Sequence, residues 1–276
     1  MSLTKRIKRI RTKLAHGVHQ VAGLANIALS ENDRRIQSFK DKHQGQAAFV
    51  LGNGPSLTPT DLDLLKPYPT FASNKIYLAY EQTDWRPTYY SVLDVLVAEN
   101  NRQEVAAVDS VKIHSSDIIP YLGHAITPDI TWLHNRYYNQ SHQHGEFKFA
   151  TNPMAGIHAG WTVIYLQLQL AYYMGFQEVY MLGLDFSFMN SPSTGQMSAH
   201  GEILKSEGEV NHFHKDYRKP GETWTVPRLD LQIKAFEAAR KTYETNGRKL
   251  VNASRKTKLE CLERADLDEV LATLAQ

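Results

Sequence analysis

The chain has 276 residues, of which 42% are hydrophobic and 22% charged, a composition typical of a globular protein rather than a disordered or fibrous one. Its length suffices for one large α/β domain with a small attachment. The single cysteine, Cys261, excludes an internal disulfide and a multi-cysteine metal site. The formal net charge of +2 is too small to indicate a nucleic-acid partner. We expect a cytoplasmic protein, since no apolar run could span a bilayer and no signal peptide is recognisable.

Residues 1–45 are predicted to form a helical extension ahead of the main domain. Six basic residues fall between positions 5 and 13: Lys5, Arg6, Lys8, Arg9, Arg11 and Lys13. Apolar residues recur three or four positions apart, which predicts an amphipathic helix: Leu3, Ile7, Ile10, Leu14, Val18 and Val21. Through residues 1–21 this helix either lies on the inner face of an anionic membrane, or packs its apolar side on the body or on another subunit of a homo-oligomer.

The main domain is expected over residues 46–276, where short apolar runs alternate with helical patterns. The predicted strands cover residues 47–51, 70–74, 89–94, 111–114, 178–185 and 249–252, and the predicted helices cover 60–66, 161–174 and 227–246. This alternation predicts an α/β fold with a mostly parallel, doubly wound, Rossmann-like sheet. Residues 115–155 are expected to be loops around a site, and residues 189–226 a lid that folds over it.

Polar residues end four of the predicted strands, at positions 52–56, 73–74, 94 and 183–185. Ligands of doubly wound sheets bind at the carboxyl ends of the strands, so these residues are site candidates. Gly52 and Gly54 would let the backbone approach a ligand closely, and the amides near Ser56 could face a phosphate. The motif is neither the dinucleotide-binding pattern nor a Walker loop, and a purely structural turn is the alternative interpretation.

The other strand ends carry side chains that suit a nucleotide. Asn74 offers donor and acceptor atoms for a base, a ribose or a phosphate, and its alternative role is a turn cap. Asp94 and Asp185 could hold ribose hydroxyls or a cation, although acids at strand ends also serve structural purposes in α/β folds.

The densest polar cluster, residues 211–218, lies in the predicted lid. A histidine there could act as general base, because its ordinary pKa near 6.5 suits proton transfer at neutral pH. Lys215, Tyr217 and Arg218 could neutralise a leaving phosphate without a metal ion. A zinc site using His212 and His214 is one alternative, and a solvated loop is another.

Four motifs in a fixed order resemble a known group of enzymes: GNGPSL at residues 52–57, SN at 73–74, GLDF at 183–186 and NHF at 211–213. The chain is similar to bacterial CMP-sialic-acid-dependent sialyltransferases, which have a Rossmann-like GT-A variant fold. It also resembles the broader MptE-like family, named for archaeal hydroxymethylpterin diphosphokinase. The resemblance spans residues 46–255.

The resemblance implies that Asn53, Ser56 and Asn74 hold the CMP moiety, and the position of Asp94 follows by order. It also implies that His212 deprotonates the acceptor hydroxyl in an inverting, metal-independent displacement of CMP. The nucleotide sugar is then a co-substrate, and neither a resident cofactor nor a metal ion is expected. The residues that we assign to substrate binding are Gly52, Asn53, Gly54, Ser56, Asn74, Asp94, Thr162, Gly183, Asp185, Ser187, His214, Tyr217 and Arg218.

Two positions depart from the sialyltransferase pattern. Ser187 stands where a tyrosine should hold the CMP phosphate, so Tyr217 or another lid residue would replace it. Gly160 stands where an arginine should lie near the sugar carboxylate, which leaves the identity of the sugar open. The sequence thus predicts a glycosyltransferase that builds cell-surface polysaccharide or glycosylates protein. A magnesium-dependent ATP diphosphokinase and a non-catalytic nucleotide- or glycan-binding protein are the alternatives.

Overall fold

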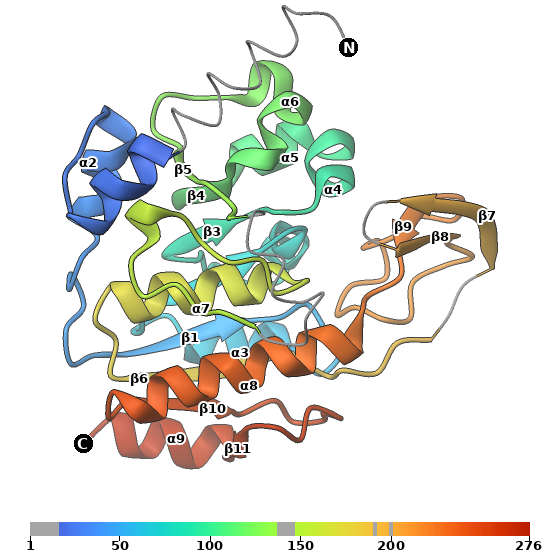
Figure 1. Ribbon diagram of the computed structural model, residues 1–276. Helices are drawn as coiled ribbons and strands as arrows, with labels where there is room; N and C mark the ends of the chain where they lie inside the picture. Colours follow the sequence, from blue (N-terminus) through green and yellow to red (C-terminus); the bar gives the residue numbers. More distant parts are fainter. Residues whose placement is uncertain (1–16, 137–146, 190–191, 199–200) are drawn as a thin grey trace, which may run out of the picture.

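A computed structural model describes residues 17–136, 147–189, 192–198 and 201–276 (Figure 1). Its centre is an eight-stranded sheet with the order β11-β10-β6-β1-β2-β3-β4-β5, and its strand pairs are parallel. The strands are β1 (Ala47–Leu51), β2 (Thr70–Ser73), β3 (Tyr89–Ser91), β4 (Val111–Ser115), β5 (Thr131–Leu133), β6 (Glu178–Leu182), β10 (Lys249–Asn252) and β11 (Glu263–Arg264). The predicted parallel, Rossmann-like sheet is confirmed.

Strand β1 is the point at which the chain changes direction across the sheet. The order runs outward from β1 through β2 to β5 on one side, and through β6 and β10 on the other. Leu51 at the end of β1 pairs with Leu182 at the end of β6, so the two following turns begin side by side. Crevices at such reversal points bind ligands in open α/β sheets.

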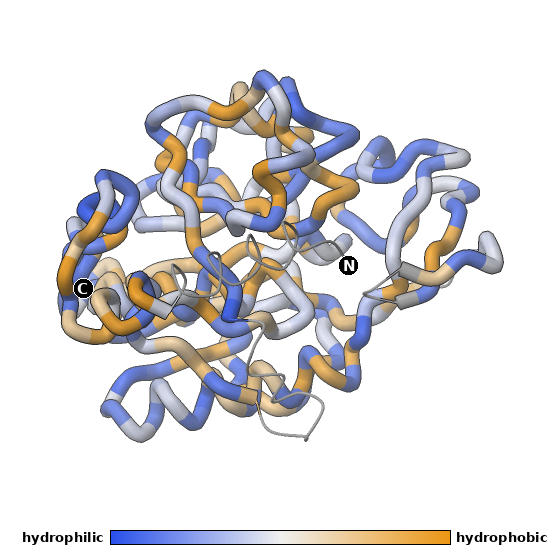
Figure 2. Tube along the Cα trace, turned by 45° about the horizontal axis from the view of Figure 1, so that its top comes forward, coloured by the Kyte–Doolittle hydropathy of each residue, from blue (hydrophilic) through white to orange (hydrophobic). Residues whose placement is uncertain are grey.

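Helices cover both faces of the sheet. They are α2 (Glu31–Ser38), α3 (Pro59–Leu64), α4 (Val95–Asn100), α5 (Arg102–Ala107), α6 (Ile119–Leu122), α7 (Val163–Tyr173), α8 (Leu229–Thr245) and α9 (Leu267–Leu274). Side chains alternate along β1, so that Ala48 and Val50 face α7 and α8, while Phe49 and Leu51 pack in the core of the opposite face with α3 and α9. In Figure 2 apolar stretches run through the middle of the trace, and hydrophilic stretches lie mainly at its periphery.

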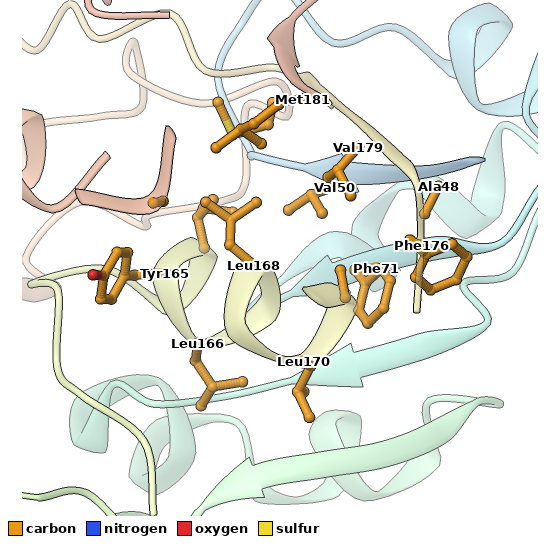
Figure 3. Packing of buried hydrophobic residues seen from close by; sticks show 14 of the residues in the cluster. Ala48, Val50, Phe71, Tyr165, Leu166, Leu168, Leu170, Phe176, Val179 and Met181 are labelled. Atoms are coloured by element: carbon orange, nitrogen blue, oxygen red, sulfur yellow. The ribbon is translucent and has the colours of Figure 1, made fainter. Parts of the chain in front are cut away.

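Helix α7 is buried on almost every side, as expected for a helix that is apolar all round. It packs Leu168 against Val50 and Phe71 of the sheet (Figure 3). The amide of Gln169, which is fully buried, accepts the backbone N–H groups of Ala150 and His158 at 2.9 Å each. Its Nε2 donates to the carbonyl oxygen of His158 at 2.9 Å. One side chain therefore fixes the loop that precedes the helix.

Residues beyond β6 leave the main sheet and form a separate antiparallel sheet (Figure 1, right). Its strands are β7 (Ser193–Ser198), β8 (Gly201–Lys205) and β9 (Thr223–Thr225). The sequence pattern missed these strands because they lack a clear alternation of apolar and polar residues. We keep the name lid for residues 189–226, and closure of this lid on a ligand stays a prediction.

The N-terminal helix pattern lies partly outside the described residues, since the structure describes it only from residue 17. Residues 17–24 are helical, and Val18 and Val21 are exposed. The expectation that this part of the apolar stripe packs on the body is therefore wrong. In the described part of the chain, no helix combines the length and the apolar character that crossing a membrane requires.

The buried glutamines of α7 yield a prediction about stability. Gln169→Leu should lower the free energy of unfolding by about 3 kcal/mol, because it strands several buried backbone groups. Gln167→Leu is the matched control: Gln167 donates one hydrogen bond, to Ala72 O at 2.7 Å, and its Oε1 has no partner among the described residues. Its expected loss is about 1 kcal/mol or less. Urea unfolding measures both, and equal losses would contradict the role of Gln169.

Candidate active site

Two backbone turns meet at the carboxyl ends of β1 and β6. The N–H of Gly52 donates to Leu182 O at 2.7 Å, and that of Gly54 donates to Gly183 O at 2.8 Å. A Cβ atom on Gly52 would lie 2.4 Å from Gly183 O, and one on Gly54 would lie 1.8 Å from Asp185 Oδ2. Both glycines are thus required for the contact between the turns. Both glycines also line the pocket described below, and the close approach of their backbone to a ligand stays a prediction.

Asp185 joins the same two turns through its carboxylate. Its Oδ2 accepts hydrogen bonds from the N–H and the Oγ of Ser56, at 3.2 and 3.0 Å. Burial raises the pKa of Asp185, and the bonds from Ser56 oppose that rise. The prediction that the amide of Ser56 faces a phosphate is therefore wrong, since a carboxylate of the protein occupies it. Helix α3 begins after its own capping box of Thr58 and Asp61.

A pocket opens above this contact and brings together most of the predicted residues. Those that line it are Gly52, Asn53, Gly54, Asn74, Thr162, Gly183, Asp185, Ser187, His212 and Tyr217. Lining residues that the sequence analysis did not assign are Ser73, Val163, Ile164, Leu184, Phe186, Phe188, Asn211 and Gln232. Strand ends, the start of α7, α8 and the lid all contribute. Ser56, Asp94, His214 and Arg218 lie outside the lining.

Asn53 lines the pocket and carries an acceptor atom without a partner. Its Nδ2 donates to Ser73 O at 3.3 Å, which directs Oδ1 the other way. This oxygen is buried and has no hydrogen-bond partner among the described residues. Because an unsatisfied buried oxygen is unfavourable, Asn53 is suited to accept an N–H or O–H group from a ligand. Neighbouring Asn74 has a left-handed backbone, with φ of 52°, a conformation that asparagine tolerates.

Asp94 has a structural role at its strand end. Its Oδ1 accepts the N–H groups of Leu96 and Val97 at 2.8 and 3.4 Å, so it caps α4. Strand β3 ends at Ser91, three residues before the expected position, and the exposed Asp94 does not line the pocket. The structure thus assigns Asp94 to the helix cap, and the ribose contact has no support from its position.

His212 lies at the edge of the lid that faces the pocket. Its ring stacks on that of Tyr217, with centroids 3.8 Å apart and planes 3° apart. Its Nδ1 lies 3.0 Å from Oε1 of Glu209, whose side chain is 1% exposed. Burial lowers the pKa of His212, while the contact with Glu209 acts to raise it. The net lowering of this pKa favours the neutral imidazole that a general base requires. Sequence reasoning missed Glu209, because nothing in this polar loop marks the acid as buried.

Two of the cations near the pocket, Lys75 and Arg218, face an acid or an aromatic ring. Lys75, which the sequence analysis also missed, is buried and lies 2.6 Å from Glu222 Oε1. The Arg218 guanidinium lies 3.7 Å from the centre of the Trp224 ring, and burial lowers its pKa. Lys215 is exposed. In this arrangement neither Arg218 nor Lys215 lines the pocket, so neither is placed to neutralise a phosphate there as expected. Burial raises the pKa of Tyr217, which keeps its hydroxyl protonated.

A zinc site in the lid finds no support from the geometry. The Nδ1 of His214 accepts the N–H of Asp216 at 3.2 Å within a local turn, and His214 is not part of the pocket lining. In the residues that the structure describes, no three His, Cys, Asp or Glu side chains are grouped to hold a metal ion.

A family comparison places the chain among known proteins. The model described as 6-hydroxymethylpterin diphosphokinase MptE-like matches residues 23–191. The chain belongs to the MptE-like family. The matched part of this MptE-like chain contains the β1 and β6 turns and ends as the lid begins. A search of curated proteins found no match.

Two solved structures are similar in fold. The MAf glycosyltransferase from Magnetospirillum magneticum AMB-1 has a TM-score of 0.50 and 14% identity, over 88% of this chain and 39% of its own. The sialyltransferase CstII from Campylobacter jejuni, solved with cytidine-5'-monophosphate, has a TM-score of 0.46 and 16% identity, over 80% of this chain and 86% of its own. This chain thus spans well under half of the MAf enzyme. At these identities the likeness concerns the Rossmann-like fold alone.

The contact between the two turns predicts the effect of a small substitution. Gly54→Ala should lower the free energy of unfolding by at least ~2 kcal/mol, because its Cβ meets the backbone oxygen of Gly183 as well as Asp185. Gly17→Ala is the matched control, since a Cβ there meets nothing within 4 Å, and it should change stability by less than ~1 kcal/mol. Denaturant unfolding measures the free energy of unfolding of both variants. If Gly54→Ala leaves it unchanged, the close contact between the turns does not contribute to stability.

Proposed function

We propose that this protein is a glycosyltransferase that moves a sugar from a CMP-linked donor to a glycan or protein acceptor. The observation that carries the proposal is the position of His212 at the pocket edge, with its Nδ1 3.0 Å from the buried carboxylate of Glu209. This is the arrangement of a general base that is oriented by an acid. In the proposal the reaction belongs to cell-surface polysaccharide synthesis or protein glycosylation and takes place in the cytoplasm.

The proposed reaction is a single inverting displacement. The acceptor oxygen attacks the anomeric carbon of the donor sugar, and Nε2 of His212 takes the proton of that hydroxyl. The bond from the anomeric carbon to the phosphate oxygen breaks, and CMP leaves with the electron pair. Glu209 would fix the tautomer by keeping the proton on Nδ1, and would stabilise the imidazolium that forms.

The nucleotide would bind at the floor of the pocket. We propose that the unpartnered Oδ1 of Asn53 accepts a hydrogen bond from a donor group of the nucleotide. Asn74 and Thr162, which also line the pocket, would contact the nucleotide beside it. The protonated hydroxyl of Tyr217 would donate a hydrogen bond to the leaving phosphate. It would thereby take the role of the tyrosine that the sialyltransferase pattern has at the position of Ser187. The proposed mechanism requires no metal ion.

The family description supports a second candidate, a diphosphoryl transfer from ATP. That reaction would need magnesium to bridge the phosphates, and magnesium is usually held by carboxylates together with substrate phosphates. Of the acids that the sequence suggested for this, Asp94 caps α4 and Asp185 is bonded to Ser56. We therefore rank this candidate, and a non-catalytic nucleotide- or glycan-binding protein, below the glycosyltransferase.

A nucleotide screen separates the two enzymatic candidates. CMP, UDP, GDP and ATP are each added to the full chain with and without magnesium, and the melting temperature is measured. We expect CMP to stabilise the protein selectively, to the same extent with EDTA as with magnesium. Stabilisation by ATP that requires magnesium would contradict the glycosyltransferase and support the diphosphokinase.

The base assignment predicts two variants with different pH behaviour. His212→Ala should reduce sugar transfer ~100- to 10,000-fold and leave CMP affinity nearly unchanged. Glu209→Gln should lower kcat ~10-fold or more, and should shift the acidic limb of the pH profile to lower pH, because the carboxylate raises the pKa of His212. Below that pKa His212 is protonated and cannot accept a proton.

Glu207→Gln is the matched control for this experiment, since Glu207 is an exposed acid two residues away. It should retain normal transfer and an unchanged pH profile. Transfer that survives in His212→Ala would remove His212 from the mechanism. If the pH profile of Glu209→Gln is not shifted, Glu209 does not raise the pKa of His212, while the role of His212 as the base is unaffected.

A further inference from the structure

The N-terminal part of the described chain carries a row of exposed apolar side chains. Val18, Val21 and Leu24 are 59%, 68% and 64% exposed, and they follow one another at three-residue spacing on the helix of residues 17–24. Ile27 and Leu29 continue the exposed row beyond the helix. We call these five residues the apolar row. Exposed apolar groups of this kind mark interaction sites.

The opposite side of this helix holds it to the protein body. A Cβ atom on Gly23 would lie 2.4 Å from Met154 O, so the helix backbone lies directly against that loop. The carbonyl oxygen of Gly23 accepts a hydrogen bond from Asn152 Nδ2 at 2.8 Å. One turn earlier, His19 Nδ1 lies 3.5 Å from Asp33 Oδ2. Because His19 and Gly23 anchor the helix, the apolar row is left facing away from the body.

The sequence that precedes the apolar row carries only positive charge. Residues 1–30 contain six Lys and Arg residues, all between positions 5 and 13, and the first acidic residue of the chain is Glu31. A segment that combines apolar side chains with a run of basic residues is complementary to an anionic lipid surface. The same charge would oppose the close approach of two copies of this segment across a symmetric dimer interface.

We propose that the apolar row is a docking surface for an anionic phospholipid membrane. The apolar side chains enter the boundary between headgroups and acyl chains, and the basic residues of positions 5–13 supply electrostatic attraction. The protein then binds at the membrane surface. This inference does not depend on the proposed glycosyltransferase activity, and it would place the enzyme beside a membrane-bound acceptor.

Sedimentation with lipid vesicles tests the proposal on the full chain. The vesicles are phosphatidylcholine alone, or phosphatidylcholine with one third phosphatidylglycerol. We expect the protein to pellet with the anionic vesicles and to be released by high salt. The variant Val18→Ser/Val21→Ser/Leu24→Ser should partition into them at least ~10-fold less, with an unchanged melting temperature.

The matched control replaces three exposed apolar residues elsewhere: Leu64→Ser/Ile126→Ser/Met197→Ser. It should bind the anionic vesicles like the unmodified chain. The proposal is overturned if the unmodified chain does not bind them, or if the variant of the apolar row binds equally well. A third outcome would also overturn it: the unmodified chain is a dimer in sedimentation velocity, the variant of the apolar row is a monomer, and neither binds vesicles. The apolar row would then join two copies of the chain.

Discussion

The contact between the turns after β1 and β6 is the constraint on which the rest of the site depends. The parallel pairing of Leu51 with Leu182 starts both turns at the same level. The carbonyl oxygen of Gly183 then approaches residues 52 and 54 so closely that neither can carry a side chain. Asp185 completes the contact by accepting two hydrogen bonds from Ser56. These turns form the rigid floor of the pocket.

The lid contacts the ends of β1 and β2 beside the pocket. The N–H of Phe213 donates to Asn53 O at 2.9 Å, which places the adjacent His212 directly above the β1 turn. Lys75, just beyond β2, pairs with Glu222 before β9. Glu209 and Tyr217 contact the ring of His212 from inside the lid. The proposed base is thus positioned by the same backbone turn that carries Asn53, and both residues line one pocket.

The fold and most of the pocket could be predicted because both leave local signals. Buried parallel strands such as β1 are short apolar runs, and their ends are marked by glycine, asparagine or aspartate. Each of the ordered motifs contributes residues that line the pocket: residues 52–57, 73–74, 183–186 and 211–213. The weak signals were those of the lid strands, which show no clear alternation of apolar and polar residues.

The remaining features depend on contacts that no local pattern reveals. Ser56 and Asp185 are 129 positions apart in the sequence. The sequence therefore could not show that Asp185, rather than a phosphate, accepts the hydrogen bond of the Ser56 amide. Asp94 was assigned to a ligand because a strand end and a helix N-cap attract the same residue types. Glu209 was missed because an acid in a polar loop resembles a solvated one until its burial is known. In each case burial or a distant partner decided the role.

The most direct measurement of the central claim is a crystal structure of the full chain with CMP bound. The account predicts that CMP occupies the pocket between the β1 turn and the lid, with a donor group of the nucleotide within hydrogen-bond distance of Asn53 Oδ1. It further predicts that Nε2 of His212 faces the open space beside the phosphate. CMP bound elsewhere, or a His212 ring turned away from the phosphate and separated from Glu209, would contradict the account.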